Sequence, residues 1–159
     1  MYKFLFLITF IILHQDIAKA KKPDPNNFNQ KYLSNYFSAI ISAKNQNDIK
    51  AISYFNNSKN LIKFHKNFLE NYVFSLVSSG KIKRSIVELK KFNSENLDVF
   101  FEGHLILFID SINNKNFEKA GSHLRELSKF QNNDTYQIII TETLRSYLDL
   151  FTNKKIIRT

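Results

Sequence analysis

Apolar residues recur every three or four positions along most of the chain, a spacing that places them on one face of an α-helix. The clearest case lies between Phe68 and Phe92. Its first half carries an apolar stripe that ends near Val77, and Gly80 then marks a turn. From Ile82 onward the stripe returns, with lysine and arginine on the opposite face. This pattern predicts two amphipathic helices that fold back on each other as a hairpin.

The same spacing predicts five more helices, separated by short polar segments rich in asparagine. They fall in the segments 30–44, 48–55, 96–112, 117–130 and 138–151. Asp48 and Asn96 are the expected caps of two of them, because a short side-chain acceptor satisfies the free amides at a helix start. The segment 138–140 has β-propensity, but helical spacing on both sides favours a helix. No strand is predicted.

A short motif recurs three times, in which a polar break is followed by a bulky apolar residue and then by a small residue about one turn later. The small residues are Ala51, Ser85 and Ala120, which lie 34 and 35 positions apart. This period is typical of helix-turn-helix solenoids, in which each hairpin covers the apolar stripe of the preceding one. We therefore predict an all-α fold, an antiparallel helix-hairpin solenoid of about three repeats plus a last helix.

On these residues the chain resembles the tetratricopeptide repeat (TPR) family, and more particularly its exported members in α-proteobacteria. The second helix of such a repeat has a small residue, a large one four positions on and a small one three further, as in Ala51, Phe55 and Ser58. The two later repeats match this pattern at the first two positions only, with Ser85 and Leu89 in one and Ala120 and Leu124 in the other. At the third position the small residue is replaced by a large one, Phe92 or Leu127. The resemblance covers residues 30–159 and implies a protein-binding module. The alternative is an all-α bundle that shows this period by coincidence.

The N-terminus has the layout of a secretory signal peptide. Lys3 precedes an apolar run of ten residues from Phe4 to Leu13, and small residues at Ala18 and Ala20 suit a signal peptidase. We expect cleavage after Ala20, a periplasmic or exported protein, and no transmembrane span afterwards. A membrane anchor or an uncleaved signal is the alternative, although an anchor needs roughly 20 apolar residues. Residues 21–29 contain both prolines and are predicted to form a linker. The helical domain is therefore expected to span residues 30–159.

The last residues repeat the start of the motif. The segment 152–157 resembles a polar break followed by the beginning of another second helix, and the sequence stops at Thr159. Solenoids need a terminal helix with a polar outer face. Three expectations stay open: the seventh helix is the cap, the chain is a shortened relative of longer repeat proteins, or another chain pairs with it there.

Composition and charge limit the classes of function that the chain can have. The chain has 43% hydrophobic residues, three glycines and two prolines, which fits a folded helical protein, and its formal net charge is +9. Eight lysines against three acids lie between Lys21 and Glu70. They suggest attraction to an anionic partner, such as an acidic protein or the membrane surface. Binding to anionic lipid or to an envelope polymer would be tested at Lys59, Lys63 and Lys66. A simple basic surface is the alternative, and nucleic acid is not expected as a partner of an exported protein.

Catalytic chemistry finds little support in the sequence. There are no cysteines, and His14, His65, His104 and His123 have no metal-ligand spacing. The histidines outside the signal are expected at surface or boundary positions. No nucleophile elbow or phosphate loop occurs. We predict no catalytic, cofactor or metal site and no enzyme.

The leading hypothesis is a protein-interaction module that binds a peptide or helix along the concave face formed by the first helices of successive hairpins. Peripheral binding to an anionic lipid or polymer through the lysine-rich first third is the alternative. The candidate polar contacts to an unknown protein or peptide partner are Asn35, Ser38, Ser42, Glu70, Asn71 and His104.

Overall fold

The computed structural model describes residues 29–65, 67–94, 99–130 and 134–153. The predicted signal peptide and all of the predicted linker except Asn29 lie outside these residues. The described helices lie in one unit that begins at Lys31, and Gln30, the first residue of the first described helix, comes directly before that unit.

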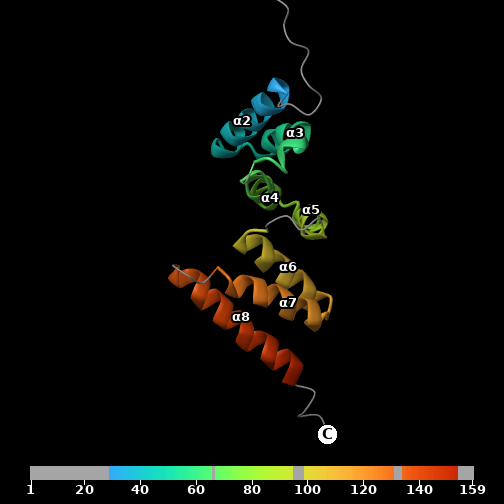
Figure 1. Ribbon diagram of the computed structural model, residues 1–159, viewed down its shortest axis with the longest axis vertical. Helices are drawn as coiled ribbons and strands as arrows, with labels where there is room; N and C mark the ends of the chain where they lie inside the picture. Colours follow the sequence, from blue (N-terminus) through green and yellow to red (C-terminus); the bar gives the residue numbers. More distant parts are fainter. Residues whose placement is uncertain (1–28, 66, 95–98, 131–133, 154–159) are drawn as a thin grey trace, which may run out of the picture. The chain divides into compact units, whose positions relative to one another are not determined.

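The described residues form seven α-helices and one short 3-10 helix, and none of them lies in a strand. The predicted all-α class is confirmed, and residues 138–140 are helical. In chain order (Figure 1) the elements are α2 (Gln30–Lys44), α3 (Asp48–Asn57), η2 (Lys59–Leu61), α4 (Phe68–Ser78), α5 (Ile82–Ser94), α6 (Phe101–Asn113), α7 (Phe117–Ser128) and α8 (Thr135–Asn153).

One predicted helix cap and one predicted helix start are wrong. The cap of α3 is Asn47, whose Oδ1 accepts a hydrogen bond from the amide of Lys50, and Asp48 is the first helical residue. Helix α6 begins at Phe101, and the extended residue before it, Phe100, is its cap. The later start places Val99 ahead of the helix, where its side chain is buried in a core cluster. The expected cap Asn96 lies outside the described residues.

Three turns between helices share one backbone geometry. Each contains a residue in the left-handed conformation, with φ of 57° at Gln46, 74° at Gly80 and 56° at Lys115. In each turn the next amide donates to a carbonyl five residues back, the pairs being Asn47 to Ser42, Lys81 to Leu76 and Asn116 to Ser111. This is the bond of a Schellman motif, which satisfies carbonyls at a helix end. The turns lie 34 and 35 residues apart, the same period as the small residues of the sequence motif.

The predicted small packing residues are buried. Ala51, Ser85 and Ala120 are each 0% exposed. The Ser85 hydroxyl donates to the carbonyl of Ile82 in its own helix, at 2.8 Å, so its polar group needs no partner in the core. A small side chain at each of these sites allows close approach of the neighbouring helix.

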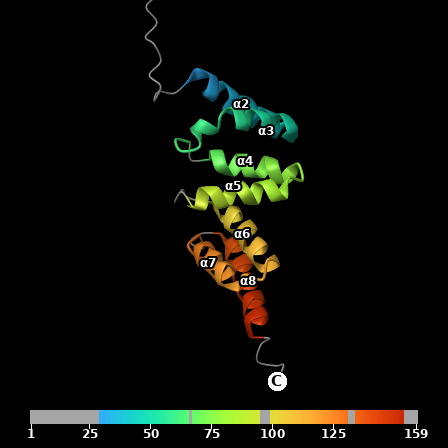
Figure 2. The ribbon, with the colours of Figure 1, turned by 90° about the vertical axis from the view of Figure 1, so that its right-hand side faces the viewer.

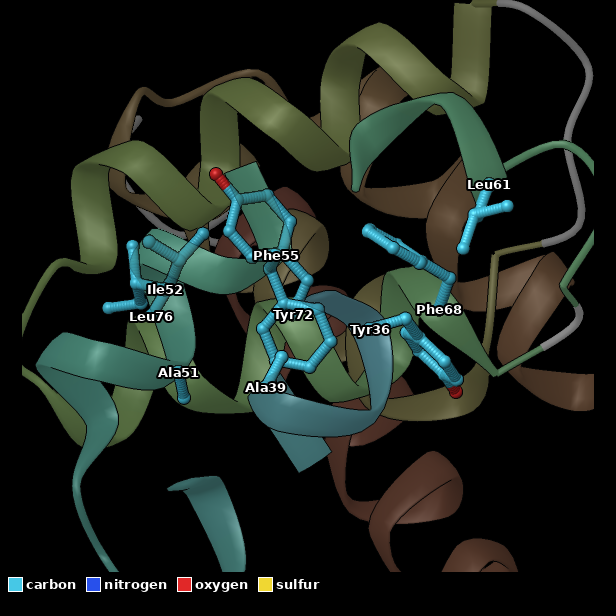
Figure 3. Packing of buried hydrophobic residues seen from close by; sticks show 9 residues of the cluster. All are labelled: Tyr36, Ala39, Ala51, Ile52, Phe55, Leu61, Phe68, Tyr72 and Leu76. Atoms are coloured by element: carbon cyan, nitrogen blue, oxygen red, sulfur yellow. The ribbon is translucent and has the colours of Figure 1, made fainter. Parts of the chain in front are cut away.

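The core consists of three clusters that share helices. Figure 3 shows the first cluster, in which α2, α3, η2 and α4 meet around Phe55, Phe68 and Tyr72. The second joins α4, α5 and α6, with Leu89 and Leu107 among its buried residues. The third joins α6, α7 and α8. Because α4 and α6 each contribute to two clusters, both are apolar on two sides.

The helices pack in chain order. Contacts join α3 to α4, α4 to α5, α5 to α6, α6 to α7 and α7 to α8, and α2 joins the first cluster through Tyr36 and Ala39. Both ribbon views show this succession of neighbouring helices (Figures 1 and 2). Most contacts are therefore between elements close in sequence.

Two helical glycines differ in the space beside them. A Cβ at Gly103 on α6 would lie 2.7 Å from Val99 Cγ1 and 3.0 Å from Leu89 Cδ2, both in the second cluster. A Cβ at Gly121 on α7 would meet its nearest atom, Leu148 Cδ2, at 3.8 Å, which is an ordinary contact. The absence of a side chain is needed only at the first of these positions.

Replacing Gly103 by alanine is expected to lower the free energy of unfolding by about 1–2 kcal/mol, because the overlap outweighs the gain in helix propensity. The matched change Gly121→Ala should raise it by up to about 1 kcal/mol, since only the propensity gain applies there. Urea denaturation followed by circular dichroism measures both. Equal stabilisation by the two changes would contradict the close contact at Gly103.

Candidate functional site

The polar residues predicted on the first helices are partly exposed. Asn35, Ser38 and Ser42 lie three and four positions apart and therefore share one side of α2. Glu70 and Asn71 lie in the first turn of α4 and are also partly exposed. These five side chains are accessible to a partner, each at a helix surface.

Asn71 is fixed in place by two neighbours. Its amide nitrogen donates to the carbonyl of Asn67 at 2.8 Å, and its side chain is hydrogen-bonded to Tyr36 on α2. Tyr36 is otherwise buried, and its ring stacks on Phe68 with centroids 5.4 Å apart. Burial raises the pKa of Tyr36, and the hydrogen bond with Asn71 opposes that change. Asn71 thus links the surfaces of α2 and α4.

Phe74 is an exposed aromatic residue on the same side of α4. It follows Glu70 by one helical turn, and 43% of its surface is accessible. Its ring lies 5.9 Å from that of the partly buried Phe100, just before α6. Sequence reasoning missed Phe74, although its spacing from the buried stripe of α4 places it on the opposite side of the helix. We call Glu70, Asn71, Phe74 and Phe100 the α4 surface.

His104 does not belong to this surface. Its side chain is 5% exposed between α6 and α7, with its Nδ1 3.4 Å from the Nδ1 of His123. The expected surface or boundary position is wrong for His104, because helical spacing aligns it with the buried residues Phe101, Leu107 and Phe108. A buried imidazole is costly to protonate, so burial lowers the pKa of His104 to about 4, helped by the charge of His123.

A polar network connects α3, η2, α4 and α5 around the buried Tyr72. The Tyr72 hydroxyl donates to Asn56 Oδ1 at 2.8 Å and accepts from Arg84 at 2.9 Å, while Arg84 also donates to Asn56 at 2.8 Å. Glu88 lies 3.4 Å from the same hydroxyl and forms an ion pair with Lys59. Burial and the charge of Glu88 raise the pKa of Tyr72 to about 12. The network joins four elements of the fold, and Arg84 at its edge is exposed.

The network changes the interpretation of the basic first third. Lys59 forms an ion pair with Glu88, and its ammonium group lies 5.2 Å from the centroid of the Tyr72 ring. Lys63 is exposed on the surface, and Lys66 lies outside the described residues. Neutralising Lys59 would therefore disturb the fold as well as any anionic contact.

Within residues 29–65, 67–94, 99–130 and 134–153, no three carboxylate or imidazole side chains lie together in a way that could hold a metal ion. No helix in that part of the chain combines the length and the apolar character required to cross a membrane.

Comparison of the chain with protein-family models, with characterised proteins and with solved structures finds no match.

Removing the Tyr72 hydroxyl tests the polar network. Tyr72→Phe is expected to lower the free energy of unfolding by about 1–2 kcal/mol, because Arg84 and Asn56 lose a partner in a partly buried site. The matched change Tyr147→Phe, at a side chain more than half exposed, should stay within about 0.5 kcal/mol of the wild type. Denaturant unfolding compares them, and equal values would show that the network does not stabilise the chain.

Acidification tests the histidine pair. The unfolded chain binds a proton at His104 near pH 6.5, whereas the folded chain binds it only near pH 4. The contribution of His104 to stability is therefore complete above pH 6.5 and is lost as the pH falls towards 4, by about 3 kcal/mol. Thermal unfolding between these pH values should show a smaller loss for His104→Phe than for the wild type. Parallel pH profiles would contradict a neutral buried His104.

Proposed function

We propose that the chain is a non-catalytic protein-interaction module with a TPR-like helical solenoid, exported to the bacterial cell envelope after removal of residues 1–20. Three turns of one geometry at a spacing of 34 and 35 residues support the repeat assignment. The burial of Ala51, Ser85 and Ala120 at the same period supports it as well. In such an architecture each hairpin is a structural unit, and the concave face formed by the first helices of successive hairpins is available for binding.

The observation that carries the proposed function is the exposed Phe74 among fixed polar groups. Large aromatic side chains contribute much of the energy of protein interfaces and are enriched there. The ring of Phe74 packs near the ring of Phe100. Asn71, one helical turn from Phe74, is held by Asn67 and Tyr36. A site of this kind is ordered before the partner arrives, which lowers the entropy cost of binding.

The chemistry of the α4 surface indicates the type of ligand. Phe74 offers an apolar contact, the Asn71 side chain can pair with polar groups of a partner, and the Glu70 carboxylate attracts a cation. The matching ligand is a peptide or helix that presents an apolar side chain close to a lysine or arginine. Asn35, Ser38 and Ser42 would extend the contact along α2 for a longer ligand.

A photo-crosslinking residue at position 74 tests the proposal in extracts of the cells that make the protein. We expect a discrete crosslinked protein, because a partner that covers Phe74 comes within reach of the reactive group. Excess wild-type protein should compete with the crosslink, and Phe74→Ala protein should compete at least about tenfold less well.

The matched control carries the same crosslinker at Val87, an exposed apolar residue on α5. Crosslinks of equal number and yield at positions 74 and 87, or equal competition by the Phe74→Ala protein, would count against a binding site on the α4 surface.

A further inference from the structure

Two histidine side chains from neighbouring helices meet within the third repeat. His104 on α6 and His123 on α7 are 19 residues apart in the sequence, and their Nδ1 atoms lie 3.4 Å from each other. His104 is 5% exposed, whereas His123 is partly exposed. The pair is therefore positioned by the packing of two helices, and solvent reaches one of its two members.

Direct bonding between the two imidazoles accounts poorly for this arrangement. Two neutral rings can form one hydrogen bond through these nitrogens, but hydrogen bonds of N–H groups are usually roughly 2.7–3.2 Å long, and the observed distance is greater. The rings are tilted by 41° with their centroids 5.7 Å apart, so they are not stacked face to face. Two nitrogen atoms thus face each other without a strong bond between them.

The distance matches that between two ligands of one tetrahedral metal ion. Zn²⁺ binds imidazole nitrogen at about 2.0–2.1 Å, and at tetrahedral angles two such nitrogens lie about 3.3–3.4 Å apart. In square-planar and octahedral sites neighbouring ligands subtend about 90°, which brings them to roughly 2.9 Å at the same bond length. The observed 3.4 Å therefore favours Zn²⁺ over ions that require those geometries.

A carboxylate is available as a third ligand. Glu126 follows His123 by three residues on α7, so the two side chains lie on the same side of that helix. Burial lowers the pKa of both histidines, and the charge of Glu126 opposes that change at each, which is the effect of a carboxylate close to both rings.

In the structure the Glu126 carboxylate is bound to Lys129, at 2.7 Å, so it is not yet a ligand in this arrangement. The side chains of this ion pair are 67% exposed at Lys129 and 39% exposed at Glu126. Exposed ion pairs contribute little to stability, so exchanging the lysine for a divalent cation costs little.

We propose that the chain binds one Zn²⁺ ion between α6 and α7, through Nδ1 of His104 and Nδ1 of His123. Glu126 turns away from Lys129 to become the third ligand, and water occupies the fourth position. Sequence spacing predicted no metal site, because the two histidines lie on different helices and only the fold brings them together. The site shares no residue with the α4 surface, so it is independent of the proposed binding of a peptide or helix.

The ion would link two helices of the folded chain. Because the unfolded chain does not hold the two histidines together, Zn²⁺ binds the folded state in preference and should raise Tm. A chelator should reverse the increase. The acidification test of His104 described above therefore applies to the protein in the presence of a chelator.

Calorimetric titration of the purified, untagged protein with ZnCl₂ tests the proposal. We expect one ion per chain, and no binding of MgCl₂. His123→Ala and His104→Ala should each weaken Zn²⁺ binding at least about tenfold, whereas the matched change His65→Ala, at the histidine beside Tyr36, should leave it unchanged. Glu126→Gln should weaken binding as well, and Glu118→Gln, at an exposed carboxylate on the same helix, should not.

Two measurements on the wild type do not depend on whether the variants fold. Co²⁺ in place of Zn²⁺ should give the strong visible absorption of a tetrahedral site, and the ¹⁵N signals of the His104 and His123 imidazoles should show coordination through Nδ1. Absence of Zn²⁺ binding at millimolar concentration, or the weak absorption of octahedral Co²⁺, would overturn the proposal. So would Zn²⁺ binding that is unchanged in a folded His123→Ala protein. Equal affinities of the Glu126→Gln and Glu118→Gln proteins would overturn the role of Glu126.

Discussion

Each helical hairpin closes through one residue in the left-handed conformation, and the rest of the fold depends on that reversal. At Gln46, Gly80 and Lys115 the chain turns back within a few residues, and the following amide reaches a carbonyl of the helix that has just ended. Only one of the three is a glycine. At Gln46 and Lys115 the left-handed backbone conformation costs roughly 1–2 kcal/mol per residue. The strain is tolerable because the bonded turn brings two apolar stripes together, and their burial offsets it.

Periodicity in the sequence was enough to predict the helices and the buried small residues, because the alternation of apolar and polar residues directly encodes which side of a helix is covered. Ala51, Ser85 and Ala120 are buried as their spacing indicated. The conformation of Gln46 could not be predicted in this way, since most residues other than glycine avoid positive φ. The start of α6 was also missed, because Val99 is apolar and continues the helical spacing although it precedes the helix.

The candidate site likewise contains some residues whose exposure could be predicted from the sequence and others whose exposure could not. The partly exposed positions on α2 and α4 followed from the helical pattern, whereas the exposure of Phe74 depends on which of two sides of α4 is covered by its neighbours. For His104 a preference for surface positions, drawn from residue type, conflicted with the spacing of the helix, and the spacing was correct. The Tyr72 network could not be foreseen, because it joins Asn56, Arg84 and Glu88 from separate elements.

The polar contacts between hairpins differ although the turns are alike. Lys59 with Glu88 joins the region of α3 to α5, and Lys90 with Asp110 joins α5 to α6, at 2.6 Å between the charged atoms. If a hairpin paired with the wrong neighbour, Glu88 would be left without its cation in a nearly buried place, at a large cost. The three hairpins are therefore not interchangeable modules. A chain whose turns repeat can pair its hairpins in the wrong order during folding, and such a pairing would lose the ion pair between Lys59 and the nearly buried Glu88.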